Sequence, residues 1–180
     1  MINLYNVDCM EYMRGLPDKA FDLAIVDPPY GIGEGQKRVN QRARSTAKWA
    51  GARPPQYGGN EWDIERPGCE YFAEVFRVSE NQIIWGANYF IDHLRPSPCV
   101  ICWHKKRDDE QNDFSDFEMA WGSFTTAARL FQLPWIGFGA VNAKERRIHP
   151  TQKPVALYRW LLQNYAKPGQ KILDTHGGSM

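Results

Sequence analysis

The tetrapeptide Asp27-Pro28-Pro29-Tyr30 combines hydrogen-bond acceptors with a rigid backbone and an aromatic ring. The Asp27 carboxylate and the Pro28 carbonyl accept hydrogen bonds, and the two prolines fix φ and supply no N–H donors. An amine on an aromatic base is a poor nucleophile because its lone pair is delocalised into the ring. Acceptors out of the ring plane would localise that pair, and the Tyr30 ring could stack on an extruded base. The tetrapeptide predicts chemistry at an exocyclic amine, although alone it is also a reasonable turn after a strand.

Three predicted strands each end at an aspartate. The apolar run 21–26 is typical of a central strand in a parallel sheet. The alternating segment 2–7 and the short segment 171–173 predict two further strands. Because ligands of open α/β sheets bind beyond the carboxyl ends of the strands, we expect three side chains to face one site, those of Asp8, Asp27 and Asp174.

The remaining patterns predict strands alternating with helices. We expect helices over 9–16 and 69–78, and a third in which Pro154 occupies the first turn and an apolar face follows. That face consists of Val155, Leu157, Trp160, Leu161 and Tyr165. Further strands are predicted over 81–85, 100–103, 117–121 and 133–138. This order predicts an α/β, Rossmann-like fold with a mostly parallel open sheet and helices on both faces.

The chain of 180 residues, 43% of them hydrophobic, is long enough for one core, so we expect a single catalytic domain over 1–180. An irregular insertion is predicted at about 31–60, and a region that recognises the target at about 105–141. The formal net charge is only +1, but the insertion contains a basic run without acidic residues. This run suits contact with phosphates, or else a solvated loop without a partner. Its basic residues are Lys37, Arg38, Arg42, Arg44, Lys48 and Arg53.

Other classes of protein are disfavoured by the sequence. The first residues do not resemble a signal peptide and no apolar run approaches membrane-spanning length, so we expect a cytoplasmic protein without a membrane partner. Scattered cysteines in such a chain favour reduced thiols. Cys99 and Cys102, with His104 nearby, could suggest a metal, but a second ligand pair is missing and the segment reads as a buried strand. We therefore predict no metal site.

Three motifs together resemble those of the DNA N6-adenine and N4-cytosine methyltransferases. They are the tetrapeptide at 27–30, His-Pro-Thr-Gln-Lys-Pro at 149–154 and Ile-Leu-Asp-Thr-His-Gly-Gly-Ser at 172–179. The catalytic motif precedes the cofactor motif, which resembles the permuted, beta-type arrangement and particularly its small phage- and prophage-borne members. Segments 6–9, 16–17, 21–22, 85–90 and 114–118 also fit the family.

The resemblance implies S-adenosylmethionine as cofactor and double-stranded DNA as partner. It implies that Asp27, Pro28, Pro29 and Tyr30 hold and stack the target base. An aspartate at the first position of the motif favours adenine N6, whereas serine would favour cytosine N4. Lys153 could meet the cofactor carboxylate, or it could be a surface lysine. The implied cofactor-binding residues are Asp8, Asp27, Thr151, Lys153, Asp174, His176, Gly177, Gly178 and Ser179.

The sequence departs from the family pattern at Met180, where a further glycine usually stands. A helix, another strand and an acidic residue for the ribose usually follow, so we expect a sheet that lacks at least one strand and weak cofactor binding. Alternatives remain open: an inactive, degenerate DNA-binding module, an N4-cytosine enzyme, or a methyltransferase acting on RNA or protein amides. The recognition sequence and the oligomeric state also stay open, with a homodimer as one alternative.

Overall fold

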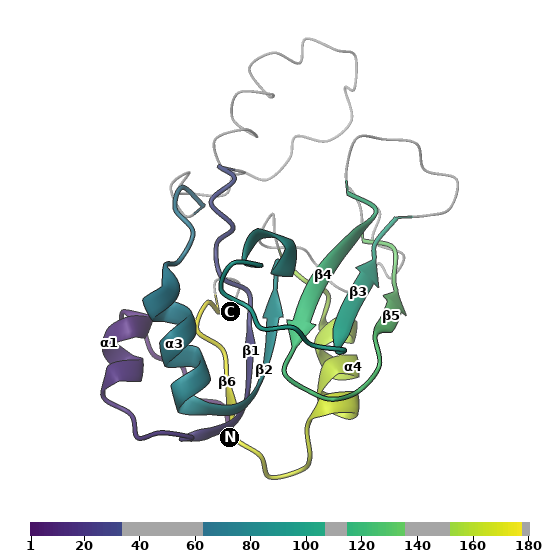
Figure 1. Ribbon diagram of the computed structural model, residues 1–180. Helices are drawn as coiled ribbons and strands as arrows, with labels where there is room; N and C mark the ends of the chain where they lie inside the picture. The colour runs from purple at the N-terminus through teal and green to yellow at the C-terminus, as the bar shows by residue number, and fades with distance from the viewer. Residues whose placement is uncertain (34–62, 107–114, 136–151, 178–180) are drawn as a thin grey trace, which may run out of the picture.

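The computed structural model describes residues 1–33, 63–106, 115–135 and 152–177 (Figure 1). These residues form one six-stranded sheet in the order β5-β3-β4-β2-β1-β6. The helices are α1 (Cys9–Arg14), α3 (Cys69–Val78), the 3-10 helix η1 (Ala87–Tyr89) and α4 (Val155–Tyr165). The strands are β1 (Phe21–Val26), β2 (Ser79–Trp85), β3 (Val100–His104), β4 (Phe117–Gly122), β5 (Arg129–Gln132) and β6 (Ile172–Leu173).

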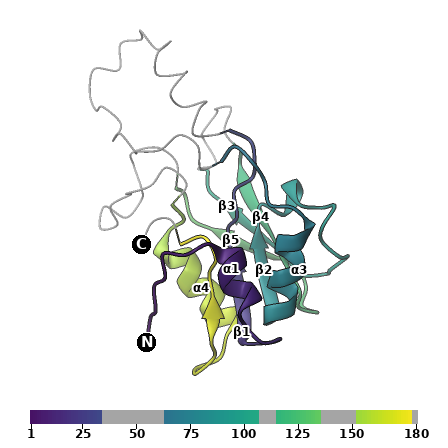
Figure 2. The same ribbon diagram turned by 90° about the vertical axis from the view of Figure 1, so that its left-hand side faces the viewer.

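Helices cover both faces of the sheet, as predicted. Figure 2 shows α3 and α4 on either side of the strands. In β1, Ala24 and Val26 pack with α1 and α3, whereas Leu23 and Ile25 pack with α4. Because successive strand residues point to opposite faces, two covered faces explain why β1 is a continuous apolar run.

The sheet is mixed because one of its strands is antiparallel to its neighbours. Strand β1 is parallel to β2 and β6, and β3 is parallel to β5. Strand β4, however, lies between β2 and β3 and is antiparallel to both. The prediction of a mostly parallel sheet is therefore correct for the strands that share one direction, β1, β2, β3, β5 and β6, and wrong for β4. Alternation of apolar residues predicts a strand but does not specify its direction.

Several elements lie where the sequence predicts them. Strand β1 has the predicted bounds, and so does α3, which buries Tyr71, Phe72, Val75 and Val78 on one stripe. Helix α1 begins after Asp8, whose Oδ1 accepts hydrogen bonds from the backbone N–H groups of Met10 at 2.8 Å and Glu11 at 2.9 Å. This cap satisfies two N–H groups that have no partner within the helix.

One predicted strand is wrong and another is wrong where the structure describes it. Segment 2–7 is not a strand and its side chains are exposed. Of the strand predicted at 133–138, residues 133–135 have no strand structure and 136–138 lie outside the described residues, whereas a strand that was not predicted lies at Arg129–Gln132. Strand β5 is exposed at the sheet edge, so it lacks the apolar run that would have predicted it.

Helix α4 differs in detail from its prediction. Pro154 is the cap residue before the helix rather than part of its first turn, and Val155 is 55% exposed rather than part of the apolar face. Leu157 and Leu161 carry the packing against the sheet and are fully buried. Among the residues that the structure describes, no helix combines the length and apolar character needed to cross a bilayer.

Candidate active site

The predicted site lies at the carboxyl ends of β1, β2 and β6. This end of the sheet is called the Asp27 edge. Asp27 follows β1, Gly86 follows β2 and Asp174 follows β6. These three strands are parallel, so their carboxyl ends share one edge. Strand β4 runs the opposite way, which brings Glu118, near its start, to the same edge. The topology therefore gathers three carboxylates from distant parts of the sequence.

The Asp27 carboxylate accepts hydrogen bonds at both oxygens. The hydroxyl of Tyr30 donates to Oδ1 at 2.7 Å, and the ammonium of Lys153 donates to Oδ2. Lys153 precedes α4 and its side chain is 3% exposed, so it is not a surface lysine. Its ammonium also lies 5.3 Å from the centre of the Trp85 ring, within range of a cation–π interaction. Asp27 thus holds a buried N–H donor at the position predicted to hold an amine.

Glu118 extends this ion pair into a network. Its Oε2 lies 3.4 Å from Lys153 Nζ, and its Oε1 accepts a hydrogen bond from Lys105 Nζ at 2.8 Å. Burial alone would lower the pKa of Lys153, but Asp27, Tyr30 and Glu118 together outweigh this and hold the pKa well above its ordinary value. Burial would likewise raise the pKa of Glu118, yet the charges of Lys153 and Lys105 keep it below its usual value. Lys153 and Glu118 are therefore both ionised at neutral pH.

The Tyr30 ring is held from several directions. It stacks on Tyr89, with ring centres 4.9 Å apart and planes 19° apart, and its edge packs against Phe90. Gly86 has a φ of 73°, and a Cβ there would come within 3 Å of three Tyr30 ring carbons. Burial raises the pKa of Tyr30 well above its ordinary value, so the phenol keeps its proton and donates to Asp27.

The turn after β6 is tied to α3. Tyr71 OH and Thr175 Oγ1 are 2.7 Å apart, and Thr175 Oγ1 lies 2.8 Å from His176 Nδ1. Asp174 Oδ1 accepts a hydrogen bond from the His176 N–H at 3.0 Å. Desolvation and the nearby negative charge of Asp27 raise the pKa of Asp174, and burial lowers the pKa of His176, which is neutral at pH 7. The turn therefore lies within electrostatic range of the Asp27 corner.

The structure brings some of the predicted residues together. Asp27, Tyr30, Lys153, Asp174 and His176 share the edge described above, with Pro28, Pro29 and Gly177 adjacent in sequence. Asp8 caps α1, and its contact with a cofactor stays a prediction. Other predicted residues lie outside the described part of the chain: Thr151, Gly178, Ser179, Lys37, Arg38, Arg42, Arg44, Lys48 and Arg53, with most of the 31–60 and parts of the 105–141 regions.

Sequence reasoning missed the roles of Glu118, Lys105 and Tyr71. Glu118 belongs to a segment that fits the family resemblance, but nothing in its spacing indicates a partner near residue 153. Lys105 belongs to a charged stretch of the sequence that does not indicate a buried partner, yet its ammonium donates a hydrogen bond to Glu118. Tyr71 has the spacing of a core residue of α3, which it also is, and only the fold reveals that its hydroxyl meets Thr175.

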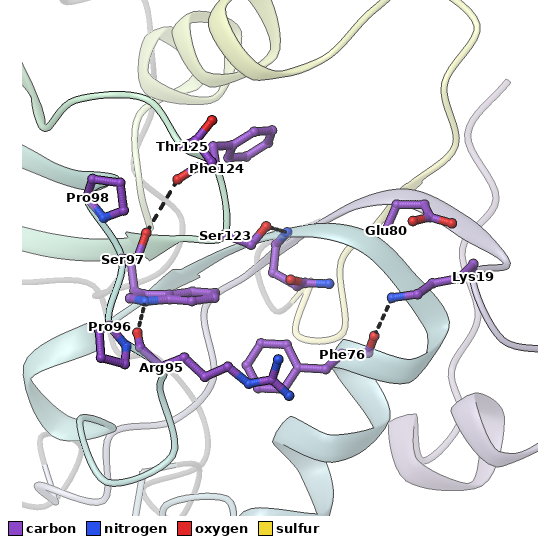
Figure 3. Close-up of a pocket in the computed structure, with 12 residues that line it drawn as sticks. Lys19, Phe76, Glu80, Arg95, Pro96, Ser97, Pro98, Ser123, Phe124 and Thr125 are labelled. Atoms are coloured by element: carbon purple, nitrogen blue, oxygen red, sulfur yellow. Dashed lines mark hydrogen bonds between the residues drawn. The ribbon is translucent and has the colours of Figure 1, made fainter.

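A cavity of about 450 Å³ lies at the opposite end of the strands (Figure 3). It is lined by side chains near the start of β2 and the end of β4, including Gln82, Trp121 and Ser123. Arg95 lies over the Phe76 ring at its rim, 5.9 Å from the ring centre. Of the predicted site residues that the structure describes, none lines this cavity, so it is separate from the Asp27 edge.

Comparisons with known proteins bear on the fold. No protein-family model matches the chain. A solved structure with a similar fold is TTHA0409 from Thermus thermophilus, described as a candidate DNA modification methylase. The TM-score is 0.50 at 13% sequence identity, and the alignment covers 93% of this chain and 76% of that one. The chain therefore shares the α/β fold of that structure.

Proposed function

We propose that this protein is a DNA methyltransferase that transfers a methyl group from S-adenosylmethionine to the exocyclic amine of a flipped base, with adenine N6 as the target. One observation carries the proposal. The Asp27 carboxylate, braced by Tyr30, accepts a hydrogen bond from an ammonium group, and it does so beside the turn after β6. The Asp27 carboxylate that accepts a hydrogen bond from the Lys153 ammonium can also accept one from the N–H of a base amine.

The charges at this edge suit a cationic cofactor. Asp27 and Glu118 pair with the ammonium groups of Lys105 and Lys153, whereas burial and the charge of Asp27 raise the pKa of Asp174, so that a cation bound beside Asp174 would stabilise its ionised form. S-adenosylmethionine carries a sulfonium, an ammonium and a carboxylate, and thus one excess positive charge. Bound there, it would supply an electrophilic methyl group. The residues of the 174–177 turn would hold its methionine part, with His176 neutral and able to donate or accept a hydrogen bond.

The Asp27 corner would act by orienting an amine rather than by removing a proton first. A carboxylate offers about four lone-pair sites, so Asp27 can accept an amine N–H while it keeps Tyr30 and Lys153. The amine nitrogen would then form its bond to the methyl carbon as the carbon–sulfur bond breaks and its electron pair stays on sulfur. The extra amine proton leaves to water. The exposed side of Asp27, whose side chain is 22% accessible, allows that approach.

The test is methyl transfer by the purified protein. Duplex DNA is incubated with tritiated S-adenosylmethionine and then digested to nucleosides. The nucleosides are separated by chromatography and identified by mass spectrometry. Asp27→Ala, which removes the acceptor, is the control. N6-methyladenine formed by the parent and not by the variant supports the proposal, and N4-methylcytosine would change the target base. RNA and protein are assayed in parallel as substrates. Label in RNA or protein with none in DNA would favour a methyltransferase that acts on RNA or on protein amides, and DNA binding without any transfer would favour a degenerate binding module.

A further inference from the structure

Asp63 is a buried carboxylate that contacts the catalytic tetrapeptide from outside it. The residue is 2% exposed, and its side chain lies next to a backbone 33 positions earlier in the sequence. Its Oδ1 accepts hydrogen bonds from the backbone N–H of Tyr30 at 2.8 Å and from that of Gly31 at 2.9 Å. Because Pro28 and Pro29 have no N–H, these are the first backbone donors after Asp27.

Two donors that converge on one oxygen fix the directions of two consecutive peptide planes. A buried carboxylate is costly unless it accepts hydrogen bonds, and bonds to a charged acceptor are stronger than those between neutral groups. Gly31 meets Asp63 with a φ of 70°, a conformation that side chains rarely adopt. The backbone therefore turns sharply at the point where Asp63 holds it.

The residues that follow Asp63 contact the same corner. A Cβ on Gly31 would lie 2.9 Å from the backbone nitrogen of Arg66, so this segment packs directly on the turn. The Arg66 guanidinium donates to the Tyr89 carbonyl at 2.7 Å, and the Tyr89 ring stacks on Tyr30. The Gly33 N–H also donates to the Asp63 carbonyl at 2.9 Å. Segment 63–66 thus fixes the backbone of Tyr30 and, through Tyr89, its ring.

We propose that Asp63 is a positioning residue for methyl transfer, an inference that rests on the proposed function. Asp63 sets the backbone of Tyr30, and Tyr30 OH sets the rotamer of Asp27 through the hydrogen bond to Oδ1. Asp63 itself need not touch the substrate. Loss of its oxygen would release the turn, so that the Asp27 acceptor would no longer be fixed relative to the methyl donor.

The experiment compares two substitutions with a surface control. Asp63→Ala removes the acceptor, Asp63→Asn keeps an oxygen that can accept both N–H bonds, and Asp18→Ala removes an exposed aspartate that pairs with Arg77. The first readout is amide hydrogen exchange followed by NMR. Asp63→Ala is expected to speed exchange of the Tyr30 and Gly31 amides by about tenfold or more, while amides of β1 and β2 keep their protection. Asp63→Asn and Asp18→Ala are expected to leave them protected.

The second readout separates kcat from cofactor affinity. Asp63→Ala is expected to lower kcat by about 100-fold, the scale of a misplaced reacting group, with the Kd for S-adenosylmethionine within about twofold of the parent. Asp63→Asn should restore most of kcat. A residue that only stabilises the fold would lower both quantities together through unfolded protein, and it would not be rescued by asparagine at unchanged cofactor affinity.

Each outcome decides one claim. If Asp63→Ala is folded, exchanges the Tyr30 and Gly31 amides faster and keeps kcat near the parent value, the positioning role is wrong. The same holds if Asp63→Asn keeps the amide protection but loses turnover, and this second outcome can be tested even if Asp63→Ala does not fold. If the parent protein transfers no methyl group, the proposed function fails, whereas the amide exchange still reports on the contact of Asp63 with the turn.

Discussion

The ammonium of Lys153 donates a hydrogen bond to the carboxylate of Asp27 across 126 positions of sequence. The pair joins the end of β1 to the residue before α4 and is nearly enclosed on the lysine side. A buried ion pair of this kind contributes little net stability over an apolar replacement, but loss of one partner leaves an uncompensated charge. Substitution of Asp27 should therefore affect both the free energy of unfolding and methyl transfer, and a second substitution at Lys153 should restore only the stability.

Asp27→Ala is expected to abolish methyl transfer and to lower the free energy of unfolding by about 2–3 kcal/mol, toward the lower end for a broken buried pair because Glu118 still faces Lys153. The double variant Asp27→Ala with Lys153→Met should regain much of that stability and none of the transfer. Urea denaturation and a radiolabel assay measure the two effects. Turnover near the parent rate in the single variant would contradict the mechanism.

The stability of the network should depend on pH through Glu118. Its folded-state pKa lies below the ordinary value of 4.5, so its contribution is present above about pH 4.5 and is lost as pH falls through the folded-state pKa. Glu118→Gln is expected to be less stable than the parent at pH 7, and the difference should shrink below pH 4.5. Denaturation series from pH 7 to 3 measure this. Parallel curves for the two proteins would show that Glu118 is not held in its ionised form.

Gly86→Ala is expected to displace the Tyr30 ring and to lower kcat by about 100-fold. Gly169→Ala is the matched control, because Gly169 also has a positive φ, 88°, but a Cβ there would meet nothing within 4 Å. Both variants should lose about 1 kcal/mol from the strained backbone, and Gly86→Ala more. Equal turnover in the two variants would show that the position of Tyr30 does not matter for transfer.

Tyr71→Phe removes the hydrogen bond to Thr175 and should loosen the turn after β6. We expect cofactor affinity to fall by about fivefold, the scale of one hydrogen bond, with little effect on DNA binding. Tyr165→Phe is the control, since Tyr165 packs against Phe124 and Trp160, away from this edge. Calorimetric titration gives both affinities. An unchanged affinity in Tyr71→Phe would separate α3 from the cofactor site.

The parts of the fold that the sequence predicts well are those with local signals. The apolar run of β1, the stripe of α3 and the prolines after Asp27 each specify structure within a few residues. The rule that parallel strands share their carboxyl edge then correctly predicts that Asp27 and Asp174 lie on one edge. The direction of β4 and the position of β5 have no comparable local signal, because both depend on which strand edge is free.

The partners of the site residues are determined by the tertiary fold. Lys153 lies in a segment that fits the family resemblance, but its buried pairing with Asp27 follows from the packing of α4 on the sheet. Nothing in the sequence around Asp63 indicates its partners, because it accepts hydrogen bonds from a turn 33 positions earlier in the chain. Contacts of this range carry no periodicity that one sequence could reveal.

The hydrogen bond between the Gly33 N–H and the Asp63 carbonyl closes the chain on itself at the boundary of the 34–62 stretch. The residues on either side of that stretch are therefore tied to each other by the backbone as well as by the Asp63 carboxylate. A sequence change between them would leave this anchor, and with it the geometry of the Asp27 corner, in place.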